Sequence, residues 1–253
     1  MNAIYPSLEG QSVLVTGGGS GIGASIVGHF AAQGSKVAFV DIAREPSEAL
    51  VAEIAAAGHP APLFLPCDLR DIDALRGAIA RAAEVNGPIT VLINNAAHDE
   101  RHAIDSVTPD YWDERMAVNL RHQFFAAQAV APMMKAAGGG AIVNFGSTSW
   151  MIGQGGMPAY TAAKSAILGL TRGLARDLGA DNIRVNSIAP GWIMTERQIK
   201  LWLTPEGEQE LMKRQCLKRK LNPADVAKLT LFLASDDSSA MTNQTYICDG
   251  GWV

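Results

Sequence analysis

Cysteine is scarce in this chain, and the three cysteines that it has lie far apart. Cys67, Cys216 and Cys248 form no closely spaced pair. A disulfide framework and a thiolate metal site both need such pairs, so the sequence predicts neither, and no metal is expected. A reducing compartment, the cytoplasm, is the simplest expectation for a chain of this kind.

Positive charge and long apolar runs are lacking as well. Lys and Arg together number 21 against 25 Asp and Glu, which leaves a net charge of −4. Nucleic-acid-binding proteins usually carry a basic excess, so no nucleic-acid partner is expected. No apolar run approaches the roughly 18 residues of a membrane span, and residues 1–10 lack the pattern of a signal peptide. The expected partner is therefore a small molecule, without nucleic acid or membrane.

Apolar residues make up 48% of the 253 residues, and they fall in short runs that alternate with helical patterns. Continuous apolar runs are typical of parallel strands buried on both faces. The sequence predicts an α/β fold: a single domain over residues 1–253 with a Rossmann-type, doubly wound parallel sheet and helices on both faces. Strands are expected at 12–16, 36–41, 63–68, 89–94, 141–145, 183–188 and 244–248, and helices at 24–33, 47–57, 72–85, 111–137, 159–178 and 224–234.

Two long segments have less regular patterns. The helix expected at 111–137 contains Pro132, which predicts a kink or a join between two helices. Residues 190–209 show no clear period and follow a strand at the carboxyl edge of the sheet. Because ligands bind at that edge in such folds, we expect this segment to be an irregular lid.

A glycine-rich turn, Thr16–Gly23, lies between the first expected strand and the first expected helix. Glycines let the backbone approach a pyrophosphate, and the N-terminus of a helix offers free N–H groups and a positive dipole. The spacing of the glycines differs from G-x-G-x-x-G, and a plain β–α turn is the alternative. We expect a dinucleotide in contact with Gly17, Ser20, Gly21, Ile22 and Gly23.

Asp41 ends the second expected strand, where an acidic side chain accepts hydrogen bonds from the adenosine ribose. Its charge would repel the 2′-phosphate of NADP, so the sequence favours NAD, although the nearby Arg44 could accommodate a phosphate. The alternative is a carboxylate that only caps the next turn. Ile42, Asp68 and Leu69 complete the contacts expected on the adenosine side.

Tyr160 and Lys164 lie four positions apart at the start of an expected helix, so their side chains share one face. A free tyrosine has a pKa near 10 and is no base at neutral pH, but a nearby cation stabilises the phenolate. Ser147 ends the fifth expected strand, where its hydroxyl could hold a substrate oxygen beside the phenol. Such a Tyr–Lys pair is common on helices, and its significance comes from the other motifs.

Together these motifs resemble the short-chain dehydrogenase/reductase family over essentially the whole chain. The matching segments are TGGGSGIG at 16–23, Asp41, Cys67-Asp68-Leu69, Asn94–Ala97, Asn119, Ser147, Tyr160, Lys164 and Pro190-Gly191. In the family the segment at 94–97 usually ends in Gly, whereas this chain has Ala97.

The resemblance implies a role for each catalytic residue. Tyr160 would be the general acid/base, and Lys164 would bind the nicotinamide ribose and lower the pKa of the phenol. Ser147 would orient the substrate, and Asn119 would hold a water in a proton relay. Asn95 and Ala96 would line the adenosine side of a bound NAD, and Pro190, Gly191, Ile193 and Thr195 its carboxamide and pyrophosphate end. A homotetramer, with the helices at 111–137 and 159–178 between subunits, is also implied.

The residues expected around the substrate mix polar groups with tryptophans, which suits a polyhydroxylated ring. Those expected to bind substrate are His98, Asn144, Ser147, Trp150, Gln154, Tyr160, Trp192 and Arg197, with Asp99 and Arg101 nearby. Segments such as NNAAHDERH (94–102) and NFGSTSW (144–150) resemble bacterial aldose 1-dehydrogenases. This implies NAD-dependent oxidation of an aldose at C1 to an aldonolactone.

Other functions remain open on the sequence alone. One is an NAD(P)-dependent dehydrogenase of alditols or secondary alcohols, or a 3-oxoacyl reductase; Asp41 argues against the NADPH that such reductions usually use. Another is a scaffold that senses NAD without turnover, which the intact set of Asn119, Ser147, Tyr160 and Lys164 argues against.

Overall fold

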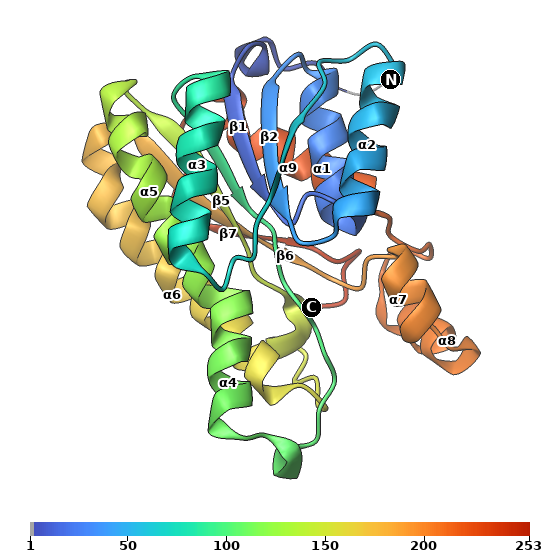
Figure 1. Cartoon of the computed structure of the whole chain (residues 1–253). Coiled ribbons are helices and arrows are strands. Elements are labelled where there is room, and N and C mark those ends of the chain that lie inside the picture. Colours follow the sequence, from blue (N-terminus) through green and yellow to red (C-terminus); the bar gives the residue numbers. More distant parts are fainter. Residues whose placement is uncertain (1–2) are drawn as a thin grey trace.

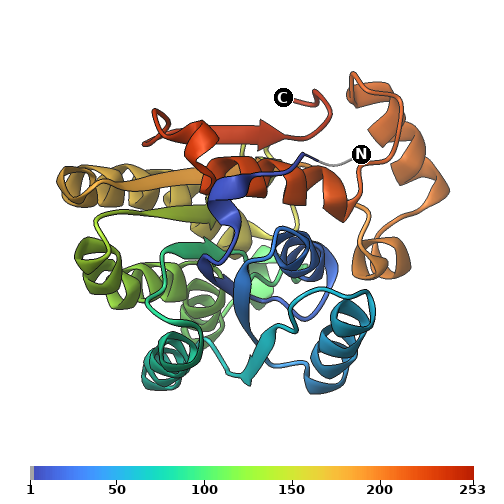
Figure 2. The same cartoon turned by 90° about the horizontal axis from the view of Figure 1, so that it is seen from above.

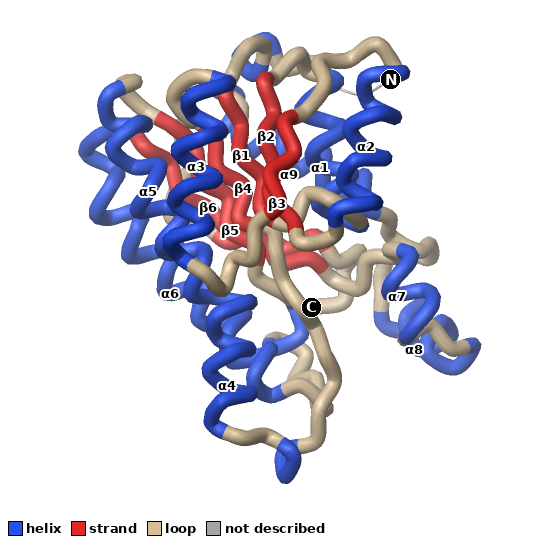
Figure 3. The backbone as a smooth tube through the Cα atoms, in the orientation of Figure 1, coloured by secondary structure: helices blue, strands red, loops and turns tan. Residues whose placement is uncertain are grey.

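A computed structural model describes residues 3–253 and shows one parallel sheet between two layers of helices (Figures 1 and 3). The sheet has seven strands in the order β3-β2-β1-β4-β5-β6-β7. The strands are β1 (Ser12–Thr16), β2 (Lys36–Asp41), β3 (Leu63–Pro66), β4 (Val91–Asn94), β5 (Gly140–Phe145), β6 (Ile183–Pro190) and β7 (Thr245–Cys248). This architecture confirms the predicted α/β, doubly wound fold.

The two helical layers are seen from the end of the sheet in Figure 2. The helices are α1 (Gly21–Ala32), α2 (Arg44–Ala56), α3 (Ile72–Asn86), α4 (Pro109–Met116), α5 (His122–Ala136), α6 (Pro158–Leu178), α7 (Glu196–Leu201), α8 (Pro205–Arg214) and α9 (Pro223–Ala234). None of the helices within residues 3–253 combines the length and the apolar character needed to cross a membrane.

The core explains why the strands are apolar without interruption. Val13 and Val15 of β1 belong to a buried cluster with Phe30 of α1 and Leu231 of α9. Leu14, between them, joins the opposite cluster with helices α3, α5 and α6. Because successive side chains on a strand point to opposite faces, a strand covered on both faces must be apolar at every position.

The order of the strands reverses between β1 and β4. Val13 pairs with Val37 of β2 on one side and with Val91 of β4 on the other. The connections after β1 and β4 therefore run to opposite sides, which leaves a crevice at the carboxyl ends of these strands, where ligands bind in open α/β sheets. α4 and the α7–α8 pair lie at this same end of the sheet (Figure 1).

Two expectations about the long segments are wrong in detail. The segment at 190–209 is mostly ordered: β6 extends to Pro190, and α7 and the start of α8 follow. Both helices are capped, because the Thr195 hydroxyl accepts from the N–H of Gln198 and the Thr204 hydroxyl from that of Gly207. These caps are local signals that a search for long periods overlooks in helices this short.

The helix expected at 111–137 has its irregularity at a different place. A π-helical turn, Ala117–Arg121, separates α4 from α5, and Pro132 lies inside α5. π-Turns insert one extra residue per turn and often occur at functional sites. Here the turn contains Asn119, whose surroundings are described below.

Candidate active site

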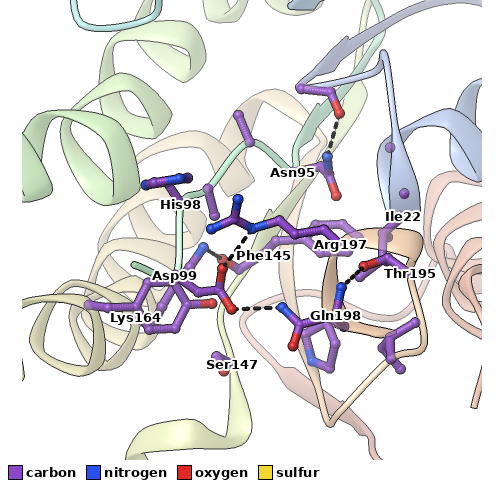
Figure 4. A pocket seen from close by; sticks show the side chains of 18 of the residues that line it. Ile22, Asn95, His98, Asp99, Phe145, Ser147, Lys164, Thr195, Arg197 and Gln198 are labelled. Carbon is purple, nitrogen blue, oxygen red and sulfur yellow. Dashed lines mark hydrogen bonds and ion pairs between the residues drawn. The ribbon is translucent and has the colours of Figure 1, made fainter. Parts of the chain in front are cut away.

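A cavity of about 1320 Å³ opens at the carboxyl ends of the strands. It is lined by nearly every residue that the sequence pointed to for cofactor or substrate. These are Gly17, Ser20, Gly21, Ile22, Gly23, Asp41, Ile42, Asp68, Leu69, Asn95, Ala96, His98, Ser147, Gln154, Tyr160, Lys164, Pro190, Gly191, Trp192, Ile193, Thr195 and Arg197. Residues far apart in sequence thus share one space, part of which is drawn in Figure 4.

The glycine turn is packed so tightly that it excludes side chains. A Cβ on Gly23 would lie 1.8 Å from the carbonyl oxygen of Gly17, and one on Gly17 would lie 2.8 Å from Cα of Ala96. Gly17 also has a φ of 67°, in the region that favours glycine. The Asn95 amide donates to the carbonyl oxygens of Thr16 and Gly17, at 3.1 and 2.9 Å. Gly17 and Gly23 are therefore required by the packing of the turn itself, whether or not a ligand binds there.

The beginning of α1 nevertheless suits an anion. Its N-cap, Ser20, makes no side-chain hydrogen bond to the helix, so the first N–H groups lack the partner that a capping side chain usually supplies. Ser20, Gly21, Ile22 and Gly23 all line the cavity. Uncapped N–H groups and the helix dipole favour a phosphate at this position. The turn therefore fits the pyrophosphate of a dinucleotide, beyond its packing role.

A pair of glycine substitutions on α1 tests this packing. Gly23→Ala is expected to lower the free energy of unfolding by about 1–3 kcal/mol or more, because neither the Gly17 carbonyl nor Asn95 can move away freely. Gly28→Ala on the same helix meets nothing within 4 Å and should be neutral or stabilising by about 0.4–1 kcal/mol. Thermal unfolding measures both, at about 2–4 °C per kcal/mol. Equal stability of the two variants would contradict the packing argument.

Asp41 lies at the end of β2 and lines the cavity. Its carboxylate accepts from the N–H of Gly19 at 2.8 Å and from that of Ala43 at 2.9 Å. It therefore does cap the next turn, and it still faces the space where a ribose would lie. Arg44, which the sequence left as a possible phosphate ligand, is exposed and paired with Glu48 at 3.3 Å.

The residues expected near the adenine include an unforeseen cation. Arg70 lines the cavity next to Asp68 and Leu69. Its guanidinium donates to both oxygens of Asp68 and to Glu114, and this hydrogen bonding holds the pKa of the Asp68 carboxyl below its usual range. Both carboxylates compete for the charge of Arg70, so it is not a free phosphate ligand.

Tyr160, Ser147 and Lys164 meet at the inner end of the cavity. Lys164 is 2% exposed; its ammonium donates to the carbonyl oxygen of Phe145 at 2.7 Å and lies 5.8 Å from the centre of the Tyr160 ring. Burial lowers the pKa of Lys164 to about 7. Burial therefore makes Lys164 a weaker fixed cation than the sequence suggested.

The pKa of Tyr160 lies above its ordinary value in this structure. Burial is the largest cause, and the carboxylate of Asp99 adds to it, whereas the Ser147 hydroxyl and the charge of Arg101 act in the opposite direction. Without a ligand, Lys164 is not among the groups that lower the pKa of Tyr160. Its ammonium is directed to the carbonyl oxygen of Phe145 instead. A further positive charge beside the phenol is needed before it ionises near neutral pH.

Asn119 is fully buried and does not line the cavity. Its side-chain oxygen accepts from the N–H of His98 at 2.8 Å, and its amide donates to the carbonyl oxygens of Arg115 and His98 at 3.0 and 3.3 Å. The side chain therefore holds the peptide of His98 in place. The relay role stays a prediction, and the amide is not free to bind a water for it.

Two expected substrate residues do not reach the cavity. Asn144 is completely buried in β5, where it accepts from the amide of Asn94 at 2.9 Å and donates to the Thr171 hydroxyl at 3.1 Å. Its side chain fills the space between the sheet and α6 rather than the ligand space. Trp150 is half-buried and also absent from the cavity wall. Both expectations rested on closeness to Ser147 in sequence, which the turn after β5 does not preserve in space.

The outer wall joins the loop after β4 to α7. Asp99 accepts from the amide of Gln198 at 2.7 Å and from Arg197 at 3.3 Å, as Figure 4 shows. The Gln198 side chain also accepts from the indole N–H of Trp192 at 2.9 Å. Gln198, Trp202 and Trp252, which also line the cavity, were not foreseen. The Thr195 cap of α7 was the one local signal that could have located Gln198, three positions further on.

The chain is similar to known oxidoreductases over nearly its whole length. The family model described as enoyl-(acyl carrier protein) reductase matches residues 17–253. A protein of Rhizobium meliloti (strain 1021) named "Probable galactose dehydrogenase GalD" is 54% identical over 98% of this chain and 96% of its own length. A D-xylose 1-dehydrogenase of Caulobacter vibrioides (strain NA1000 / CB15N) is 51% identical over 99% of both chains.

Solved structures agree with this relationship. A short-chain type dehydrogenase/reductase from Mycobacterium ulcerans superposes with a TM-score of 0.92 at 29% sequence identity, over 97% of this chain and 90% of that one. The similarity therefore covers the sheet, both helical layers and the cavity.

Proposed function

We propose, from the premise that this chain belongs to the short-chain dehydrogenase/reductase family, that it oxidises an aldose at C1 to the aldonolactone with NAD as the acceptor. Members of this family are oxidoreductases that use a nicotinamide cofactor. The observation that supports the sugar most is the identity of 54% and 51%, over almost the full length, to proteins named for galactose and D-xylose.

The lining of the cavity supports a polyhydroxylated substrate. The wall that contains Tyr160 also contains His98, Gln154 and Arg197, together with the rings of Trp192 and Trp202. Polar groups can pair with hydroxyls, and aromatic faces can cover the C–H groups of a sugar ring. A long acyl chain or a steroid would favour a more uniformly apolar wall.

The preference for NAD is supported by the charges beside the ribose position. Asp41 brings a carboxylate to the cavity. Arg44, three positions further along the chain, and Arg70, on the cavity wall, are paired with Glu48 and Asp68. A ribose with free hydroxyls can donate to the carboxylate, whereas a 2′-phosphate would meet uncompensated negative charge.

In the mechanism that this geometry supports, the phenolate of Tyr160, formed once a further positive charge lies beside it, takes the proton of the anomeric hydroxyl. Ser147 lines the cavity together with Tyr160 and would hold the substrate oxygen within reach of it. Lys164 is fixed through the Phe145 carbonyl. A nicotinamide cofactor held along the glycine turn and Asp41 would supply the acceptor for the C1 hydride and, in its oxidised form, a positive charge in the site. Loss of the hydroxyl proton and of the C1 hydrogen with its electron pair leaves a C=O bond, which makes the lactone.

Exposed apolar side chains and free cysteines bear on assembly and compartment. A homotetramer is supported by two large exposed apolar side chains on neighbouring helices, Trp112 of α4 and Phe124 of α5, which are 40% and 42% exposed. Cytoplasmic location is supported by three free cysteines, of which Cys67 is buried.

The direct test is NAD reduction, followed by absorbance, with a panel of aldoses, their alditols and simple secondary alcohols, each repeated with NADP. Turnover of aldoses with NAD is expected, with the product trapped as a lactone. Turnover of alditols or other secondary alcohols, with none of aldoses, would be consistent with the proposed catalytic residues but would overturn the assignment of an aldose as substrate. Binding of NAD without any turnover would instead favour a nucleotide-sensing protein.

A further inference from the structure

A largely buried arginine forms part of the cavity wall next to His98. Arg115, near the end of α4, has a side chain that is only 8% exposed. Its guanidinium pairs with Glu100 at 3.0 Å and with Glu114, and it covers the ring of Tyr111. The two carboxylates balance the positive charge of Arg115. Its Nη1 atom also points to His98 at the cavity wall.

The contact between Arg115 and His98 determines where the imidazole proton is. Nη1 of Arg115 lies 2.7 Å from Nδ1 of His98. An arginine in a protein is always protonated and can only donate. Nδ1 must therefore accept, which leaves the ring neutral and places its one proton on Nε2.

The charges around His98 favour the same neutral form. Burial is the largest cause that lowers the pKa of His98, and the guanidinium groups of Arg197 on α7 and Arg115 on α4 add to it. Glu100 and Asp99, on the same loop as His98, act in the opposite direction but do not outweigh these effects.

The backbone of His98 is also held in place. Asn119 holds both the N–H and the carbonyl of His98, as described above. Asn119 belongs to the π-turn that continues directly from α4, so one helical segment holds the backbone and the ring of His98 together. Figure 4 shows His98 beside Asp99 on the loop that borders the pocket.

The opposite side of the imidazole is available to a ligand. The His98 side chain is 39% exposed and lines the cavity. Among residues 3–253, no side chain or carbonyl forms a hydrogen bond with Nε2. We propose that His98 is a specificity residue whose Nε2–H, fixed by Arg115 as a positioning residue, donates a hydrogen bond to an oxygen of the sugar.

This inference rests on the proposed function for the identity of the substrate, but the tautomer can be measured without any substrate. In ¹⁵N-labelled protein at pH 7, the His98 signals are expected to show a protonated Nε2 and an unprotonated Nδ1. Arg115→Lys retains a donor and should preserve this pattern, whereas Arg115→Met should give a mixture of tautomers. A doubly protonated ring or an Nδ1–H tautomer in the unmodified chain would overturn the proposal.

The kinetic test uses variants that separate donation from packing. His98→Leu is expected to raise KM about tenfold with little change in kcat, because it removes one hydrogen bond that is formed equally before and during reaction. His98→Gln retains an N–H donor and should recover much of the loss. Among sugars that each lack one hydroxyl, one should have a kcat/KM about tenfold below that of the full sugar with the unmodified enzyme. With His98→Leu, the same deoxy sugar and the full sugar should have equal kcat/KM. An equal rise in KM in His98→Leu and His98→Gln, or an unchanged KM in both, would show that His98 does not donate a hydrogen bond to the sugar.

Arg115→Met should also add to kcat/KM a limb that falls as pH rises, because removal of the positive charge raises the pKa of His98. The protonated ring keeps its Nε2–H, whereas the neutral ring of this variant is a mixture of tautomers and loses part of that donor. Arg115→Lys should retain the pH profile of the unmodified chain, and an unchanged profile in Arg115→Met would contradict the positioning role. If the enzyme oxidises another alcohol and no aldose, the proposed function fails, and the same comparison with that alcohol still decides the role of His98.

Discussion

Tyr160→Phe is expected to lower kcat/KM by about 10²–10⁴-fold, the range that a single general acid/base contributes. The substitution removes one oxygen and leaves the ring that fills this part of the wall. Binding of NAD, measured by fluorescence or calorimetry, should weaken by about fivefold at most, because a single hydrogen bond to the ribose is worth about 1 kcal/mol. The signature is therefore a loss of turnover in a folded, cofactor-binding protein.

The matched control is Tyr246→Phe. Tyr246 lies on β7, outside the cavity wall, and the change removes the same hydroxyl. It should leave kcat and KM as they are. Wild-type turnover by Tyr160→Phe would exclude the phenol as the base, and a loss of NAD binding would show that the hydroxyl acts in cofactor binding.

The pH dependence follows from the direction of the Tyr160 shift. Because burial and Asp99 raise the pKa of the phenol, the ligand-free site holds a neutral phenol through the physiological range, and the rate should rise with pH. Asp99→Asn removes a carboxylate that raises this pKa, so its rising limb should move to lower pH. A limb that moves to higher pH would contradict the electrostatic argument.

Asp41→Asn is expected to change the preference between NAD and NADP by about 10²-fold. Removal of the carboxylate weakens the hydrogen bonds to the ribose, which to a charged group are worth about 1.5–3 kcal/mol. It also removes a repulsion with the 2′-phosphate of about 1–4 kcal/mol at contact distance. The kcat/KM with NAD should fall and that with NADP should rise.

A control of equal charge change is available nearby. Glu48→Gln removes a carboxylate from α2 that is paired with Arg44 and lies outside the cavity wall, so it should not alter the preference. Because Asp41 also accepts from Gly19 and Ala43, thermal unfolding of Asp41→Asn should accompany the assay. An unchanged preference in a stable variant would show that its carboxylate only caps the turn.

The sequence was most informative where structure is local. The apolar runs predicted each strand because a doubly covered strand must be apolar at every position, and the clusters around Val13 and Leu14 show this directly. The glycine turn could be located because Gly17 and Gly23 are required by the path of the backbone. The cavity collects Asp41, Ser147, Tyr160 and Lys164 because parallel strands place their carboxyl ends at one edge.

Local sequence patterns did not predict which way each side chain points at the carboxyl edge of the sheet. Asn144 precedes Ser147 by three positions, yet the pleat of β5 directs it to Asn94 and Thr171 in the interior. α7 and α8 were missed because short helices depend on their caps and on packing more than on a long apolar period.

The sequence by itself determined the order of the seven strands, the glycine turn and the positions of the residues proposed for catalysis, because each depends on neighbours along the chain. Only the tertiary structure decided the protonation of the polar groups that face the substrate. Arg115 meets His98 across 17 positions, and Arg197 meets Asp99 across 98. Burial shifts the pKa of Lys164 and Tyr160. These effects arise from charges and solvent exclusion in space, and distance along the chain does not encode them.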